Sequence, residues 1–136
     1  PLIPMFTLGH NFSPANIHAG GLRYHGAGSI VSKLMKDELM SAVDLKQLDT
    51  FKAATLFAQA EGILPAPESS HAIAAAIHEA EQAKNEGKPR TILFNLSGHG
   101  LIDMAAYDQY LSGDLTNYEV TDEEVANNLK DLEKII

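Results

Sequence analysis

The sequence predicts an α/β fold, in which helices flank a small parallel sheet, and two observations lead to this prediction. The run from Thr91 to Leu96 is apolar without alternation, which is typical of a strand buried on both faces of a parallel sheet. Segments with apolar residues every three or four positions, typical of amphipathic helices, lie on both sides of this run. We therefore expect the order strand, helix, helix, strand, glycine turn and helix, with parallel crossover connections.

The elements before the first long helix are short. Residues 1–28 show neither a helical nor a strand period, so we expect a long irregular segment there. A short helix is expected from Ser29, as its cap, to about Asp37. A short strand is expected over 39–44.

The next three helices have recognisable ends. Asp44 is expected to cap the first of them, and Gly62 to end it, because glycine readily takes the left-handed conformation. The second should run from near Glu68 to Gly87. Asp103 is expected to cap the third.

A capping box, Thr121 with Glu124 three residues on, opens a last helix. The 136 residues, of which 45% are hydrophobic, are enough for one domain with a buried core. We expect an irregular segment over 1–28, an α/β core over 29–120 and a C-terminal helix over 121–136.

Composition excludes several classes of function. The absence of cysteine rules out disulfides, zinc–thiolate sites and thiol nucleophiles, and it suits a cytoplasmic protein. A net charge of −8 argues against binding to nucleic acids and to anionic membrane surfaces. No apolar stretch approaches the length of a membrane span. The first residues, from Pro1 to Phe6, lack a basic region and an initiator methionine, so we expect a piece of a longer chain rather than a signal peptide.

Two connections carry the residue types of a binding site. Ser97–Gly100 follows the predicted buried strand, where glycines let a ligand approach the backbone at a helix start. A plain tight turn explains this pattern equally well. Pro65–His71 places an acid, two hydroxyls and an imidazole at another helix start, where ordinary capping is the simpler interpretation. Because the two are successive α/β connections, we expect them to lie close together.

A hydrolase and a metal site are both disfavoured. Ser97, His99 and Asp103 are the residue types of a catalytic triad, but a nucleophile elbow needs glycine two positions before and after the serine. Asn95 and His99 occupy those positions. The sequence contains no His-x-x-x-His pair, so no metal site is expected.

Several motifs in the expected order resemble tryptophan synthase beta chains. Two of them are similar to the C-terminal third of these chains, EGILPAPESSHA over 61–72 and NLSGHG over 95–100. Three more are similar to the second class, which does not depend on the usual alpha subunit: PLIPMFTLGH over 1–10, IHAGGLRYHG over 17–26 and LIDMAAY over 101–107. The resemblance implies a pyridoxal-phosphate enzyme of fold type II.

The resemblance also implies roles for five residues. Ser97 would hydrogen-bond the pyridine nitrogen of pyridoxal phosphate, and Glu68 would lie near the cofactor ring. Gly98 and Gly100 would let the ring and the phosphate side pack closely. Arg23 stands where the usual beta chain has an aspartate that touches the substrate hydroxyl, so we expect Arg23 to bind substrate.

The implied reaction is the formation of L-tryptophan from indole and serine or phosphoserine by β-replacement. An arginine near the leaving group favours phosphoserine, because a guanidinium can hold a phosphate through paired hydrogen bonds. The family's Schiff-base lysine, catalytic glutamate and glycine-rich phosphate loop lie upstream of anything in this chain. We therefore expect no catalytic residue here, and no activity from the chain alone.

The implied parent is a homodimer, and we expect this chain to self-associate through apolar residues near its start, which are Leu2, Ile3, Met5 and Phe6. Two alternatives remain. One is a non-catalytic phosphate- or nucleotide-binding module built on the turn at Ser97, although that turn is too short for a Walker or Rossmann motif. The other is a structural domain, which would not need the glycines and histidines clustered before Gly28.

Overall fold

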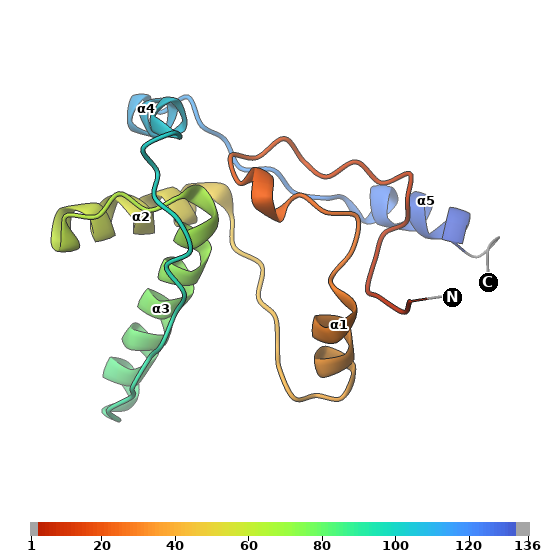
Figure 1. Ribbon diagram of the computed structural model, residues 1–136, viewed down its shortest axis with the longest axis horizontal. Coiled ribbons are helices and arrows are strands. Elements are labelled where there is room, and N and C mark those ends of the chain that lie inside the picture. Colours follow the sequence, from red (N-terminus) through yellow and green to blue (C-terminus); the bar gives the residue numbers. More distant parts are fainter. Residues whose placement is uncertain (1–2, 133–136) are drawn as a thin grey trace. The chain divides into compact units, whose positions relative to one another are not determined.

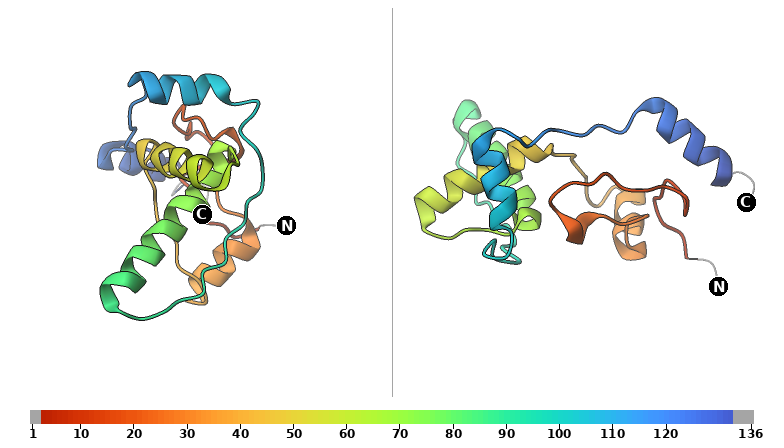
Figure 2. Two further views of the ribbon diagram at one scale, coloured as in Figure 1. Left: turned by 90° about the vertical axis from the view of Figure 1, so that its left-hand side faces the viewer. Right: turned by 90° about the horizontal axis from the view of Figure 1, so that it is seen from above.

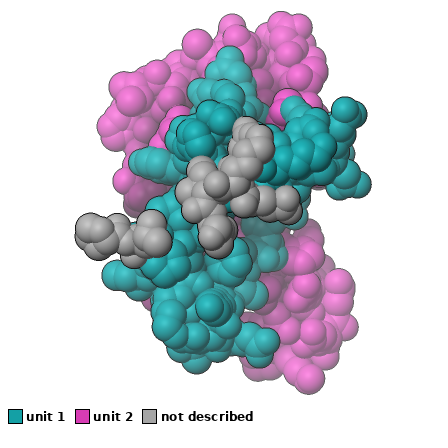
Figure 3. All heavy atoms as spheres, turned by 90° about the vertical axis from the view of Figure 1, so that its right-hand side faces the viewer, with its two compact units in different colours: residues 1–16, 23–44, 119–136 teal, residues 17–22, 45–118 magenta. Residues whose placement is uncertain are grey.

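The computed structural model describes residues 3–132, which form helices joined by long extended segments (Figure 1). The elements in chain order are a 3₁₀ helix η1 (Gly20–Leu22) and the α-helices α1 (Ser29–Lys36), α2 (Gln47–Glu61), α3 (Pro67–Glu86), α4 (Met104–Ser112) and α5 (Asp122–Leu132). The chain divides into two compact units, coloured separately in Figure 3. Unit 1 comprises residues 1–16, 23–44 and 119–136, and unit 2 comprises residues 17–22 and 45–118.

The predicted parallel sheet is not confirmed, because no segment between residues 3 and 132 forms a strand. The runs over 39–44 and 91–96 are both extended but unpaired. A strand needs a neighbour to accept and donate its backbone hydrogen bonds, and the described part of the chain provides none for these runs. In keeping with this, the Leu93 side chain is 95% exposed.

Helix α2 begins two residues later than predicted, because side chains from a distant segment take the place of the local cap. Its N-cap residue is Lys46 rather than Asp44, and no side chain caps it locally. Instead, the Leu48 N–H donates to Asn117 Oδ1 at 2.9 Å, and Gln47 Nε2 donates to a backbone carbonyl in the same distant segment. The N-terminal N–H groups of a helix need acceptors from any source, and here the source is 69 residues away.

The other predicted helix ends agree with the structure to within one or two residues, and the predicted cap of α1 differs in its exact position. Gly62 and Gly87 both end their helices in the left-handed conformation, at φ of 69° and 65°. The capping box that opens α5 is confirmed, since the Glu124 N–H donates to Thr121 Oγ1 at 3.2 Å and the Thr121 N–H donates to Glu124 Oε2 at 2.8 Å. Ser29 is the first helical residue of α1 rather than its cap. The last four positions of the predicted helix over 121–136 lie outside the described residues.

The core of unit 2 lies between α2 and α4, and the right-hand view of Figure 2 shows α4 crossing α2. Phe51 of α2 is 1% exposed and packs edge-on against Tyr107 of α4, with ring centroids 5.1 Å apart. Tyr110, also of α4, stacks on Phe51 with ring centroids 5.7 Å apart. Aromatic contacts of this kind add to the stabilisation that burial itself supplies. The same cluster includes Leu115, beyond the end of α4.

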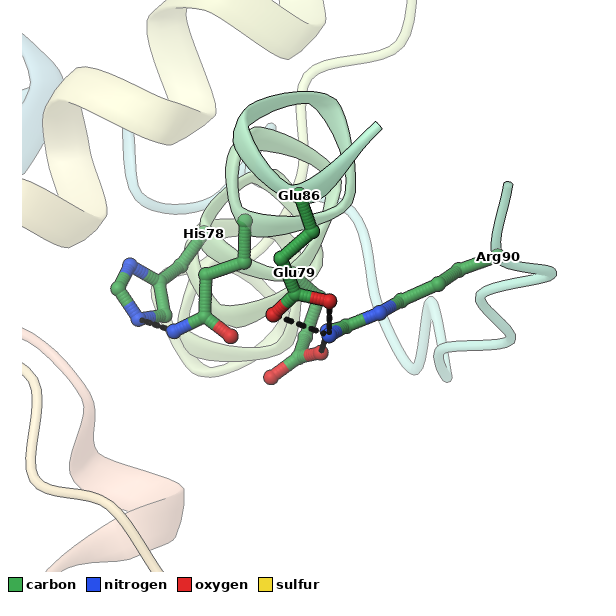
Figure 4. Close-up of polar contacts among 5 residues, drawn as sticks. His78, Glu79, Glu86 and Arg90 are labelled. Carbon is green, nitrogen blue, oxygen red and sulfur yellow. Dashed lines mark hydrogen bonds and ion pairs between the residues drawn. The ribbon is translucent and has the colours of Figure 1, made fainter. Parts of the chain in front are cut away.

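An arginine holds the chain against α3 where it turns back after Gly87 (Figure 4). The Arg90 guanidinium lies 2.6 Å from Glu79 and 3.0 Å from Glu86, both on α3. The hydrogen bond to Glu86 is the main reason why the pKa of Arg90 is raised. The extended segment that follows leads back along α3 to Ser97, which contacts the first turn of the same helix.

Unit 1 is organised by hydrogen bonds between its first segment and α1. The Phe6 N–H donates to Ser32 Oγ at 3.1 Å, and the Ala27 N–H donates to the Phe6 carbonyl at 2.9 Å. Thr7 and Gly26 form an isolated antiparallel bridge beside these bonds. The apolar residues expected to drive self-association are exposed where they are described, at 63% for Ile3, 46% for Met5 and 53% for Phe6, whereas Leu2 lies outside the described residues.

None of the helices described between residues 3 and 132 is both long and apolar enough to cross a membrane.

Candidate functional site

The two connections singled out from the sequence lie against each other in unit 2, as expected. The Ala66 N–H donates to the Gly98 carbonyl at 2.9 Å, and the Gly100 N–H donates to the Leu64 carbonyl at 2.8 Å. An antiparallel bridge joins Pro65 to His99 between these two bonds. The start of α3 and the turn after the extended segment therefore form one backbone-paired structure.

Ser69 fastens the turn to the first turn of α3. Its side chain is buried, and its Oγ lies 2.9 Å from the Ser97 Oγ. The same oxygen accepts hydrogen bonds from the backbone N–H groups of Ser97 and Gly98, both at 3.1 Å. Ser97 itself is exposed, so its hydroxyl lies at the surface while its anchor is in the interior.

The turn packs closely against the connection before α3 because Gly98 and Gly100 have no side chains. A side chain would be tolerated less well at Gly100 than at Gly98. A Cβ atom at Gly100 would collide with the Pro65 carbonyl and lie 2.9 Å from the ring of Tyr107. At Gly98 a Cβ would lie 3.3 Å from the Ala66 Cβ, a tight contact but a milder one. Helix α4 begins at Met104, with Asp103 at the N-cap position that the sequence predicts, although no side chain caps it locally.

Tyr107 supports the site from the core. Its hydroxyl donates to the buried Pro65 carbonyl at 2.5 Å, which links α4 to the connection before α3. Burial raises the pKa of the Tyr107 phenol, a hydrogen bond with Ser70 partly opposes this, and the negative charge of Asp103 adds to the increase. The folded state therefore favours the protonated phenol, and this contribution to stability is complete below about pH 10 and lost as the pH rises through the folded-state pKa.

We expect Tyr107→Phe to lower the free energy of unfolding by about 1–3 kcal/mol at pH 7, because the Pro65 carbonyl loses its buried donor. The difference from the unchanged protein should shrink above pH 10, because the variant has no phenol there to ionise. Urea unfolding at pH 7 and pH 10.5 measures both effects. Tyr24→Phe is the matched control, since Tyr24 is 72% exposed. If the difference in free energy of unfolding between Tyr107→Phe and the unchanged protein is the same at both pH values, ionisation of the phenol does not affect stability.

The Glu68 side chain is hydrogen-bonded to the 3₁₀ helix η1. Its Oε1 accepts a hydrogen bond from the Gly21 N–H at 2.8 Å. A Cβ on Gly21 would lie 3.1 Å from this carboxylate, so the residue must stay small for the contact to form. The structure thus brings Glu68, Ser97, Gly98 and Gly100 together in unit 2 with η1 beside them.

Arg23 belongs to unit 1, where its own neighbours orient it. The exposed guanidinium donates to Asn16 Oδ1 at 3.2 Å and to the Pro14 carbonyl at 3.3 Å. Five N–H donors are available on a guanidinium, so these two bonds leave others for a ligand. The contacts point the side chain without neutralising its charge, because neither partner is a carboxylate.

Sequence reasoning missed the roles of Ser69 and Tyr107. Ser69 was assigned only to capping, although its real partners lie 28 and 29 residues ahead. Nothing local in the sequence reveals the bond from the Tyr107 hydroxyl to the Pro65 carbonyl. The repeated serine after Glu68 was the one available signal, since two adjacent hydroxyls are more than a single cap needs.

No protein-family model matches the chain. Curated relatives match it closely over most of its length. Tryptophan synthase beta chain 2 of Methanosarcina mazei is 60% identical over 115 residues, which are 85% of this chain and 26% of that protein. The protein of the same name from Aquifex aeolicus is 58% identical over 117 residues, which are 86% of this chain and 27% of that protein. The one from Pyrococcus furiosus is 50% identical over 129 residues, which are 95% of this chain and 29% of that protein. The chain thus spans about a quarter of the length of these relatives.

Proposed function

We propose that this chain, which is a homologue of the tryptophan synthase beta chains, forms one side of the pyridoxal-phosphate site of an enzyme that makes L-tryptophan. The reaction is β-replacement, in which indole takes the place of the leaving group of serine or phosphoserine. Pyridoxal phosphate supplies the electron sink for this chemistry when it is bound. The single observation that carries the proposal is the hydrogen-bonded meeting of the Pro65–His71 and Ser97–Gly100 connections, the two motifs that the resemblance assigns to the cofactor.

The residues present fit the cofactor in chemistry. Ser97 offers a neutral hydroxyl at the surface of an otherwise rigid turn, and a neutral donor suits an unprotonated pyridine nitrogen. The resemblance assigns Gly98 and Gly100 to the cofactor side of the turn, and the lack of a side chain at each lets the turn pack against Ala66, Pro65 and Tyr107. Glu68 stays close through its bond to Gly21 and limits the space at the edge of the site.

The parent enzyme has pyridoxal-phosphate fold type II in this proposal, which explains the unpaired apolar run over 91–96. We assign this run to a strand of the parent's sheet, whose neighbours belong to the part of the relatives that this chain does not span. The 95% exposure of Leu93 supports the assignment, because such a side chain is rarely left bare in an apolar run. A homodimeric parent would cover the exposed Ile3, Met5 and Phe6 in the same way.

Ser97→Ala in the full-length enzyme tests the proposed function. Removing the donor to the ring nitrogen should weaken pyridoxal-phosphate binding roughly 5- to 150-fold, which corresponds to about 1–3 kcal/mol for an unpaired buried polar group. Equilibrium titration of the apoenzyme, followed by the absorbance of the bound cofactor, measures this change. Ser112→Ala serves as the control, since Ser112 is an exposed serine at the end of α4. Unchanged cofactor affinity and spectrum in Ser97→Ala would refute the proposal.

A further inference from the structure

The arrangement of hydrogen bonds around Ser69 decides which way the Ser97 hydroxyl points. Ser69 is the third residue of α3 and is 2% exposed. Its Oγ has four polar neighbours, all on the turn. These are the Ser97 N–H at 3.1 Å, the Gly98 N–H at 3.1 Å, the Ser97 Oγ at 2.9 Å and the Gly98 carbonyl at 3.5 Å.

A serine hydroxyl has one hydrogen to donate and two lone pairs to accept with. The two backbone N–H groups can only donate, so they occupy both lone pairs of Ser69 Oγ. The single hydrogen of Ser69 is then left for the Ser97 Oγ at 2.9 Å, because the Gly98 carbonyl at 3.5 Å is at the limit of a hydrogen bond.

Ser97 is therefore the acceptor in its bond with Ser69, and its own hydrogen must point elsewhere. Since Ser97 is exposed, this hydrogen is directed toward whatever binds at the surface of the turn. A ligand atom that meets it must be an acceptor with a lone pair. An unprotonated pyridine nitrogen is such an atom. A protonated pyridine nitrogen has no free lone pair, so it cannot accept the hydrogen of Ser97.

We propose that Ser69 is a positioning residue that turns the Ser97 hydroxyl outward as a donor, and so favours the unprotonated form of the ring nitrogen. This inference rests on the proposed function, because it assumes that the ligand of Ser97 is the ring of pyridoxal phosphate. Ser69 does not itself touch the ligand. It acts by occupying one of the two lone pairs of the Ser97 oxygen, which turns the Ser97 hydrogen outward.

The next residue shows what an ordinary serine in this helix turn does. Ser70 is 1% exposed, as buried as Ser69, but its Oγ donates to the Ala66 carbonyl one helical turn back at 2.9 Å. This local bond is common for serine in helices. Ser70 also hydrogen-bonds the Tyr107 phenol of α4, and neither of these two bonds involves Ser97. Ser70→Ala therefore matches Ser69→Ala in burial and position but leaves Ser97 undisturbed.

A double-mutant cycle in the full-length enzyme tests the proposal, with Ser69→Ala, Ser97→Ala and the two combined. We expect Ser69→Ala to weaken pyridoxal-phosphate binding about tenfold, in line with the loss of one hydrogen bond. The same change should have a much smaller effect once Ser97 is alanine, because the Ser97 hydroxyl is then gone and only the bonds from Ser69 to the backbone N–H groups of Ser97 and Gly98 are left to lose. Ser70→Ala should bind the cofactor like the unchanged enzyme.

Enzyme loaded with ¹⁵N-labelled pyridoxal phosphate adds a readout that a merely structural role would not move. In Ser69→Ala the ring nitrogen resonance should shift toward the value of an unbonded pyridine, and in Ser70→Ala it should not. If Ser69→Ala does not fold, the near-isosteric pair Ser69→Thr and Ser69→Val replaces it. The threonine variant keeps a hydroxyl and should bind the cofactor at least fivefold more tightly than the valine variant.

Two outcomes would overturn the inference while leaving the proposed function intact. One is additive losses in the cycle, and the other is equal cofactor binding by the threonine and valine variants. If Ser97→Ala itself leaves cofactor binding unchanged, the proposed function fails and the inference fails with it.

Discussion

Gly100→Ala should lower the free energy of unfolding of this chain by about 3 kcal/mol, the upper end of what overpacking typically costs. The added methyl group would meet the Pro65 carbonyl and the Tyr107 ring, neither of which has room to retreat. Pro65 is held by the bridge to His99, and Tyr107 is 4% exposed in the core. Relief of the clash requires the turn to move away from α3 and to break the bond from the Gly100 N–H to the Leu64 carbonyl.

Urea unfolding followed by circular dichroism measures this loss. Gly20→Ala is the control in the same unit, because a Cβ there meets nothing within 4 Å. We expect the control to unfold at nearly the same urea concentration as the unchanged chain. Gly98→Ala should fall between the two, since its closest contact would be 3.3 Å from the Ala66 Cβ. If Gly100→Ala and Gly20→Ala unfold alike, the close packing of the two connections is not what stabilises the turn.

Arg23→Ala in the full-length enzyme should lower kcat/KM for phosphoserine roughly 10- to 100-fold more than for serine. Paired, charge-assisted hydrogen bonds to a phosphate are worth about 1.5–3 kcal/mol, and only the phosphorylated donor can form them. The contacts of Arg23 with Asn16 and Pro14 already orient the guanidinium, so little ordering remains to be done on binding.

Tryptophan formation from indole with each donor gives the ratio directly. Arg23→Lys should recover only part of the preference for phosphoserine, because an ammonium keeps the charge but not the planar fork. Arg90→Ala is the control for loss of an arginine elsewhere, since Arg90 is paired with the α3 carboxylates of Glu79 and Glu86. Equal losses for both donors would show that Arg23 does not read the phosphate, and the preference for phosphoserine would be withdrawn.

The sequence by itself determined the local features of this protein. The ends of α2 and α3 at Gly62 and Gly87 follow from glycine's access to the left-handed region, and the start of α5 follows from a capping box of two residues three positions apart. The resemblance carried by the motifs over 61–72 and 95–100 is borne out by relatives that are 50–60% identical. Each of these signals is contained in a short stretch of chain.

Only the tertiary structure decided the features that depend on partners far along the chain. The run over 91–96 has the composition of a buried strand, yet it forms none, because backbone pairing depends on which neighbours are present and not on the run itself. Helix α2 takes its cap from Asn117, and the Ser97 turn takes its anchor from Ser69. A hydroxyl or amide satisfies whichever buried donor the fold brings within about 3 Å, and sequence spacing carries no information on that choice.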